Sequence, residues 1–352
     1  MINDKNLTQE GGNDSTNYQA HSITINQGIS YEQAEKIALS VYRENFLQMS
    51  QDAASTALHR AEKITQDFLQ SLNASNEQAL QSMRNPSMQA ALYNAQKAYA
   101  ITGDNDLEGV LVNILVERAA HDKRTIQQIT LDESIIVAPK LTFEQMDALT
   151  LNFLFSRTSK SNVRNIKDMT AFLRDEVAPF VSSAKINRTV FEHLEYAGCG
   201  SFMDANHLRA LPEIFRIKYK GIFSRGGSAE DYASLLENPT ARENLLIRCL
   251  RDSTLLQICA LTDSHLDEIC ANNALPPEIT KTAKVMFEQH TMNVQEIQTE
   301  IVKMCPELEK LFSDWVNTDL SNFSLTTVGI AIARANLKRR TGVDTELGNW
   351  IN

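Results

Sequence analysis

The sequence has few cysteines and none of the segments that mark a secreted or membrane protein. Five cysteines occur in 352 residues. Their number is odd and no Cys-x-x-Cys pair is present, so we expect reduced thiols in a cytoplasmic protein. The start, Met-Ile-Asn-Asp-Lys-Asn, lacks the apolar core of a signal peptide. No apolar run reaches the roughly 18 residues of a membrane-spanning helix.

The common catalytic and cofactor motifs are also missing. We find no phosphate-binding loop, no dinucleotide-binding glycine motif, no nucleophile elbow and no His-Glu-x-x-His. The His and Cys spacings match no zinc site, so we expect neither a metal nor a cofactor. A net charge of -10 repels phosphate, which disfavours nucleic acid as a partner.

Glycine and proline are absent from Tyr31 to Asn73, where apolar residues recur at spacings of three and four. This pattern predicts one helix about 65 Å long at ~1.5 Å per residue. Ser30 and Gln33 have the spacing of a capping box at its start. Such a helix needs a partner, either residues 76–102 returning antiparallel or the same helix of other copies. The face that we assign to self-association includes Ile37, Val41, Ala53, Ala57 and Ala61.

One strand-like segment precedes this helix. Residues 12–26 are rich in Asn, Ser and Thr, and Ile23 and Ile25 alternate with polar residues. No clear partner strand follows in the sequence, and a lone strand is not stable in water. We therefore expect residues 12–27, with Tyr18, Ile23 and Ile25, to mediate or reinforce self-association.

The remaining sequence reads as further helices separated by Gly, Pro and polar breaks. Thr142 and Gln145 predict a second capping box, and Ser224–Gly227 is the best candidate for a domain boundary. Helices are also expected at about 106–121, 123–137, 166–182, 187–197, 212–220 and 326–340. The predicted fold is an all-α, multi-helix array with a very long N-terminal helix and one short N-terminal β segment. Its predicted units are a polar tail with the strand at 1–27, a helical hairpin or stalk at 28–102, and helical domains at 103–222 and 223–352.

Two groups of polar residues are candidates for a binding or catalytic site. Arg188 and His193 have the Arg-x-x-x-x-His spacing that resembles helical ribonucleases of the HEPN type. One such match is expected by chance among 34 basic residues and seven histidines, and a surface salt-bridging pair is the simpler interpretation. Near the C-terminus a basic cluster could bind an anion, or could complement the dipole at the end of its helix. That cluster comprises Arg334, Lys338, Arg339 and Arg340. Cys199, between two glycines, fits a tight helix-ending turn better than a nucleophile.

Several stretches together resemble a locus-named, uncharacterised bacterial family of Legionella and Veillonella. They are Gly12-Asn13-x-Ser15-Thr16-Asn17-x-Gln19-Ala20, Gly28-Ile29-Ser30-Tyr31, Pro139-Lys140-Leu141-Thr142 with Gln145-x-Asp147-x-Leu149, Leu194-Glu195-Tyr196-x-Gly198-Cys199-Gly200-Ser201, and Leu325-Thr326-x-Val328-Gly329-Ile330-Ala331-Ile332. The resemblance implies no activity and transfers no functional residues. The first stretch is also similar to Asn/Ser/Thr-rich segments of bacterial anti-phage proteins.

The sequence thus favours a non-enzymatic protein that self-associates and acts as a scaffold or sensor, with a role in anti-phage defence. Its expected partners are further copies of itself and another protein of the same operon. The alternative is a HEPN-like ribonuclease that uses Arg188 and His193. We expect no membrane partner.

Overall fold

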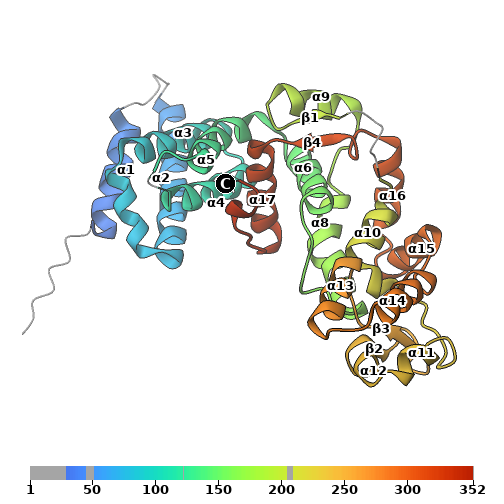
Figure 1. Cartoon of the computed structure of the whole chain (residues 1–352). Coiled ribbons are helices and arrows are strands. Elements are labelled where there is room, and N and C mark those ends of the chain that lie inside the picture. The colour runs from blue at the N-terminus through green and yellow to red at the C-terminus, as the bar shows by residue number, and fades with distance from the viewer. Residues whose placement is uncertain (1–28, 45–50, 122, 204–208, 352) are drawn as a thin grey trace, which may run out of the picture.

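A computed structural model describes residues 29–44, 51–121, 123–203, 209–351 of the chain, to which every structural statement below refers. The all-α prediction is confirmed, since helices dominate and the strands are few and short. Figure 1 shows an N-terminal bundle on one side, a C-terminal group of helices on the other, and a middle section that joins them.

The N-terminal bundle consists of five helices and one 3-10 segment. They are α1 (Tyr31–Glu44), α2 (Gln51–Ser75), η1 (Glu77–Arg84), α3 (Pro86–Thr102), α4 (Asn105–Ala119) and α5 (Ile126–Val137). The predicted capping box forms here, since Ser30 and Gln33 exchange its two hydrogen bonds at 3.1 and 3.3 Å. Asn85 caps α3, with Pro86 as its first residue.

The prediction of one helix from Tyr31 to Asn73 is wrong. The chain forms α1 and α2, which lie side by side and antiparallel. The Tyr42 hydroxyl donates to the Ala57 carbonyl (3.4 Å), and Gln96 Nε2 bridges the Ala38 carbonyl and Thr65 Oγ1 at 3.2 and 2.8 Å. Folding back lets α1 and α2 cover each other's apolar faces, which a single extended helix could not do. The absence of Gly and Pro permits a continuous helix but does not enforce one.

The middle section begins with α6 (Phe143–Ser156), whose predicted capping box between Thr142 and Gln145 is present. A helical stretch at 166–181 follows, made of α7 (Ile166–Ala171), the π-helical segment η3 (Phe172–Val177) and α8 (Ala178–Val181). It precedes α9 (Arg188–Tyr196) and the strand β1 (Gly200–Phe202).

The C-terminal group contains seven helices and two strands among the described residues. They are α10 (Leu211–Tyr219), α11 (Ala233–Glu237), α12 (Pro239–Leu245), β2 (Leu246–Arg248), β3 (Leu256–Ile258), α13 (Asp263–Asn272), α14 (Pro277–Gln289), α15 (Val294–Met304) and α16 (Leu308–Asn317). Tyr232, Leu235, Leu266 and Phe287 belong to a core cluster of α11–α14 that is separate from the main core.

The chain then returns to the N-terminal bundle through β4 (Phe323–Leu325) and α17 (Thr327–Thr341). Figure 1 shows α17, in red, beside α4 and α6, and it also packs on α5. Every residue from Gly329 to Leu337 is buried. A helix buried on all sides needs apolar or paired side chains around its whole circumference, and α17 has them.

The sequence shows no clear strand after the N-terminal segment, but the fold contains two short strand pairs. Antiparallel pairs β1–β4 and β2–β3 contain three residues in each strand. Strands of this length leave too short an alternation to be recognised in a sequence. The predicted strand at 12–26, with Tyr18, Ile23 and Ile25, lies outside the described residues. In the described ranges, none of the helices combines the length and apolar composition needed to cross a membrane.

Candidate functional site

Two of the stretches that carry the family resemblance meet where the middle section contacts α17. We call this place the junction, and define it by Gly198–Phe202 and Phe323–Gly329. Strand β1 pairs with β4, so that Gly200 lies opposite Leu325 and Phe202 opposite Phe323. Thr326 continues the contact, because its N–H donates to the Cys199 carbonyl (3.1 Å) and its Oγ1 to the Gly198 carbonyl (2.6 Å).

Close packing of the α17 backbone against that of Cys199 requires a glycine at Gly329. A Cβ at this position would stand 1.9 Å from the carbonyl oxygen of Cys199. The Cys199 side chain is fully buried, and burial raises the pKa of its thiol to about 12. A thiol with such a pKa carries no thiolate at neutral pH, so Cys199 is a packing residue, as the sequence suggested.

The two residues of the ribonuclease alternative both lie on α9, but they contact different partners. The Arg188 guanidinium pairs with Glu192 (3.0 Å) and Asp319 (3.2 Å) and lies 4.2 Å from the centre of the Phe202 ring. His193 Nδ1 shares a hydrogen bond of 2.9 Å with Gln145 Nε2. Arg188 is thus matched by two carboxylates, whereas His193 is hydrogen-bonded to a neutral amide.

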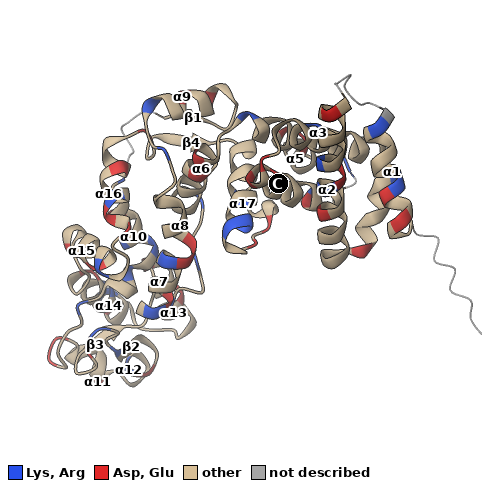
Figure 2. Ribbon diagram, turned by 180° about the vertical axis from the view of Figure 1, so that it is seen from behind, with Lys and Arg blue, Asp and Glu red and all other residues tan. Residues whose placement is uncertain are grey.

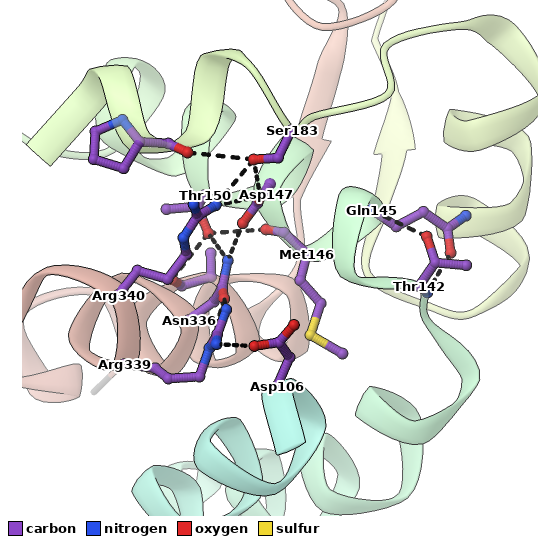
Figure 3. A network of polar contacts seen from close by, with 12 residues as sticks. Asp106, Thr142, Gln145, Met146, Asp147, Thr150, Ser183, Asn336, Arg339 and Arg340 are labelled. Atoms are coloured by element: carbon purple, nitrogen blue, oxygen red, sulfur yellow. Dashed lines mark hydrogen bonds and ion pairs between the residues drawn. The ribbon is translucent and has the colours of Figure 1, made fainter. Parts of the chain in front are cut away.

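A buried polar network fixes α17 to its neighbours (Figure 3). Asp147 has no exposed surface, and its carboxylate accepts from Asn336 Nδ2 (2.8 Å), Ser183 Oγ and Arg340 Nη1. Asn336 Oδ1 in turn accepts from Arg339, which pairs with Asp106. Residues of α4, α6, α17 and the turn after α8 are thereby joined, and a satisfied network of this kind stabilises one arrangement of the helices.

Each member of the C-terminal basic cluster has a carboxylate partner. Figure 2 shows the basic last turn of α17 among acidic residues. The pairs are Arg334–Glu117, Lys338–Asp344, Arg339–Asp106 and Arg340–Asp147. The cluster is therefore divided in space: Arg339 and Arg340 belong to the buried network, whereas Arg334 and Lys338 line a cavity.

The residues assigned to self-association on the long helix have mixed exposure. Ala57 and Ala61 are buried in a small core cluster with Tyr42 and Ala100. Ile37 and Val41 are partly exposed, and Ala53 is exposed. Part of that face is thus covered within the chain.

The cavity that Arg334 and Lys338 line has a volume of about 480 Å³. The end of α2, α4, α17 and the segment after α17 form its walls. The sequence did not identify its acidic members. Glu117 comes from a distant segment, and nothing in the sequence shows that Asp344 and Glu346, which follow the basic cluster closely, face a cavity. A second cavity of about 490 Å³ lies between α13 and α14. Among the described residues no group of His, Cys, Asp and Glu could hold a metal ion.

Comparison with known proteins gives one result. No curated protein and no solved structure matches the chain. A model of a locus-named, uncharacterised family, represented in Veillonella parvula and without an assigned activity, matches residues 28–351. This match covers nearly the whole chain, including the junction, and the protein belongs to that family.

Proposed function

We propose that the protein is a non-enzymatic scaffold or sensor that acts by self-association. The observation that carries this proposal is a stripe of exposed isoleucines on α5. Ile126, Ile129 and Ile136 are 60%, 42% and 44% exposed. Their spacings of three and seven place them on one face of the helix. Aliphatic side chains gathered in this way on a surface are typical of sites that bind another protein.

A second copy of the chain suits this stripe because of the charges around it. Glu133 lies exposed between Ile129 and Ile136, while Lys123 and Arg124 lie exposed just before α5. None of the three forms an ion pair within the described residues. Antiparallel packing of two α5 helices, centred near Ile129, would bring each Glu133 close to the Lys123 and Arg124 of the other copy. Ile126 and Ile129 of both copies would then be covered between two matched charge clusters.

Residues 12–27 are a second, independent element of the self-association proposal. Their alternation favours pairing with a strand of another chain. The two elements can be separated experimentally, since one lies in the N-terminal segment and the other on α5.

Light scattering of the full chain tests the proposal. We expect an oligomer at tens of micromolar, and a smaller species with an unchanged helical circular dichroism spectrum in Ile129→Glu. The matched control is Ile217→Glu, because Ile217 is 49% exposed on α10, away from the stripe. Removal of residues 1–27 should also reduce the mass. A monomeric full chain would refute self-association. An unchanged mass of the oligomer in Ile129→Glu would show that the stripe takes no part in it.

We further propose that this scaffold works in the cytoplasm and in defence against phage, together with a product of the same operon. Five free cysteines support a reducing compartment. The defence role is supported by the likeness of the N-terminal segment to those of anti-phage proteins. Phage plating on hosts with and without the intact operon tests it: equal plating efficiency across a broad phage panel would contradict the role.

A further inference from the structure

The cavity between α4 and α17 holds a buried arginine with free hydrogen-bonding capacity. Arg334 is only 5% exposed. Its Nη1 donates to both oxygens of Glu117 at 3.1 and 2.9 Å, and its Nε donates to Thr345 Oγ1 at 3.1 Å. The remaining nitrogen, Nη2, has no acceptor in the described part of the chain. Because Arg334 lines the cavity, these N–H groups are available to a molecule inside it.

A carboxylate is the natural acceptor for a guanidinium nitrogen in this position. Charge-assisted hydrogen bonds between Arg and carboxylate are strong, and they gain strength where water is excluded. The same guanidinium lies over the face of the Trp350 ring, with 5.8 Å between Cζ and the ring centre. Arg334 is therefore held in place before any ligand binds, so that little side-chain entropy is lost on binding.

The other charges of the cavity show what else the ligand must carry. Its lining contains two cations, Arg334 and Lys338, and three carboxylates, Glu117, Asp344 and Glu346. Arg334 is paired with Glu117 and Lys338 with Asp344. Glu346 is exposed and has no such partner in the described chain. One negative charge is thus left over, and a ligand with only a carboxylate would be repelled by it.

We propose that this cavity binds a basic amino acid. The α-carboxylate accepts from Arg334 Nη2, and a cationic group of the ligand lies at Glu346. A free basic amino acid carries one net positive charge at neutral pH, which matches the surplus negative charge of the lining. The volume of about 480 Å³ lies in the range of small-molecule sites. This site does not depend on self-association, and either proposal can fail without the other.

Isothermal titration of the full chain with L-arginine and with L-lysine tests the site. We expect at least one of them to bind with a Kd of about 1 mM or tighter. Agmatine and cadaverine, which lack the α-carboxylate, should bind at least about tenfold more weakly than the parent amino acid. L-glutamate should not bind, because it brings a second carboxylate towards Glu346.

The variant Glu346→Gln locates the binding. It should weaken binding of the amino acid about tenfold, the loss of one charged contact. Glu309→Gln is the matched control, since Glu309 is also an exposed carboxylate without an ion pair in the described chain but lies on α16, away from the cavity and from the isoleucine stripe. No heat of binding from either amino acid, or equal binding in Glu346→Gln and the unmodified protein, would overturn the proposal. Light scattering on the same samples reports self-association separately.

Discussion

Replacing Gly329 by alanine should destabilise the protein although alanine is the better helix former. Gly329 lies in the first turn of α17, where its backbone rests on that of Cys199. A C···O contact normally measures about 3.3–3.6 Å. The new Cβ would stand 1.9 Å from the Cys199 oxygen and 2.9 Å from its carbonyl carbon. Backbone atoms cannot rotate away as a side chain can, so α17 and the Cys199 segment must separate.

The expected loss follows from the contacts that this separation strains. Two hydrogen bonds from Thr326, to Cys199 and to Gly198, join the same segments. Each contributes about 0.5–1.5 kcal/mol. Overpacking strain adds about 1–3 kcal/mol. The higher helix propensity of alanine offsets about 1 kcal/mol of this loss. We therefore expect the free energy of unfolding to fall by about 3 kcal/mol.

Gly348→Ala in the 3-10 turn η6 (Leu347–Asn349) is the control for this measurement. Its Cβ would meet a single atom, Gln127 Nε2 at 3.2 Å, which is the end of a side chain. We expect the free energy of unfolding of Gly348→Ala to stay within about 1 kcal/mol of the unmodified protein. Urea denaturation followed by circular dichroism measures both variants. Equal stability of Gly329→Ala and Gly348→Ala would contradict the close backbone contact at the junction.

Three further predictions concern single side chains. Asp147→Ala should cost about 3–5 kcal/mol in urea denaturation, because Arg340 and Asn336 lose their acceptor; a loss below 1 kcal/mol would contradict the buried network. We expect no RNA cleavage by the protein or by His193→Ala, and cleavage that His193→Ala abolishes would revive the ribonuclease alternative. Burial lowers the pKa of Lys218 from 10.5 to about 8. Between these values the unfolded chain binds more protons than the folded one, so stability should rise with pH relative to Lys218→Met. Parallel urea midpoints of the two proteins from about pH 8 to pH 10 would show that Lys218 titrates normally.

Local signals in the sequence predicted much of the helical architecture. The capping boxes at Ser30 and Thr142 and the helix start at Thr326 depend on residues a few positions apart. Such interactions are complete within one turn, so the sequence alone contains them. The division into α1 and α2 was missed for the opposite reason. Whether a helix continues or folds back there depends on Tyr42, Ala57 and Gln96 meeting in three dimensions.

The candidate site was predictable only in its components. The sequence shows that Arg334, Lys338, Arg339 and Arg340 are close together near the end of α17. It does not show the carboxylate partners of the three arginines, which lie about 200 residues earlier in the chain. These partners are Glu117, Asp106 and Asp147 for Arg334, Arg339 and Arg340 in turn. Likewise, the glycines around Cys199 predict a tight turn at the end of a helix without showing that Gly329 packs against the Cys199 backbone. Long-range pairing decides which basic residues are neutralised in the core and which face a cavity.

Helix α17 connects the candidate sites and explains how a ligand could affect the rest of the protein. Its first turn contacts the junction, Arg334 lies at its centre, and its last turn is held to α4 and α6 by the buried network. A ligand on Arg334 would contact a helix whose two ends are both fixed. Movement of that helix would have to separate Thr326 from Cys199 or Arg340 from Asp147. Because both contacts are buried or backbone-to-backbone, such a helix responds by shifting between a few packed positions and not by gradual bending. A sensor that uses this cavity therefore requires α17 to occupy two positions. In both positions Gly329 must fit against the Cys199 backbone.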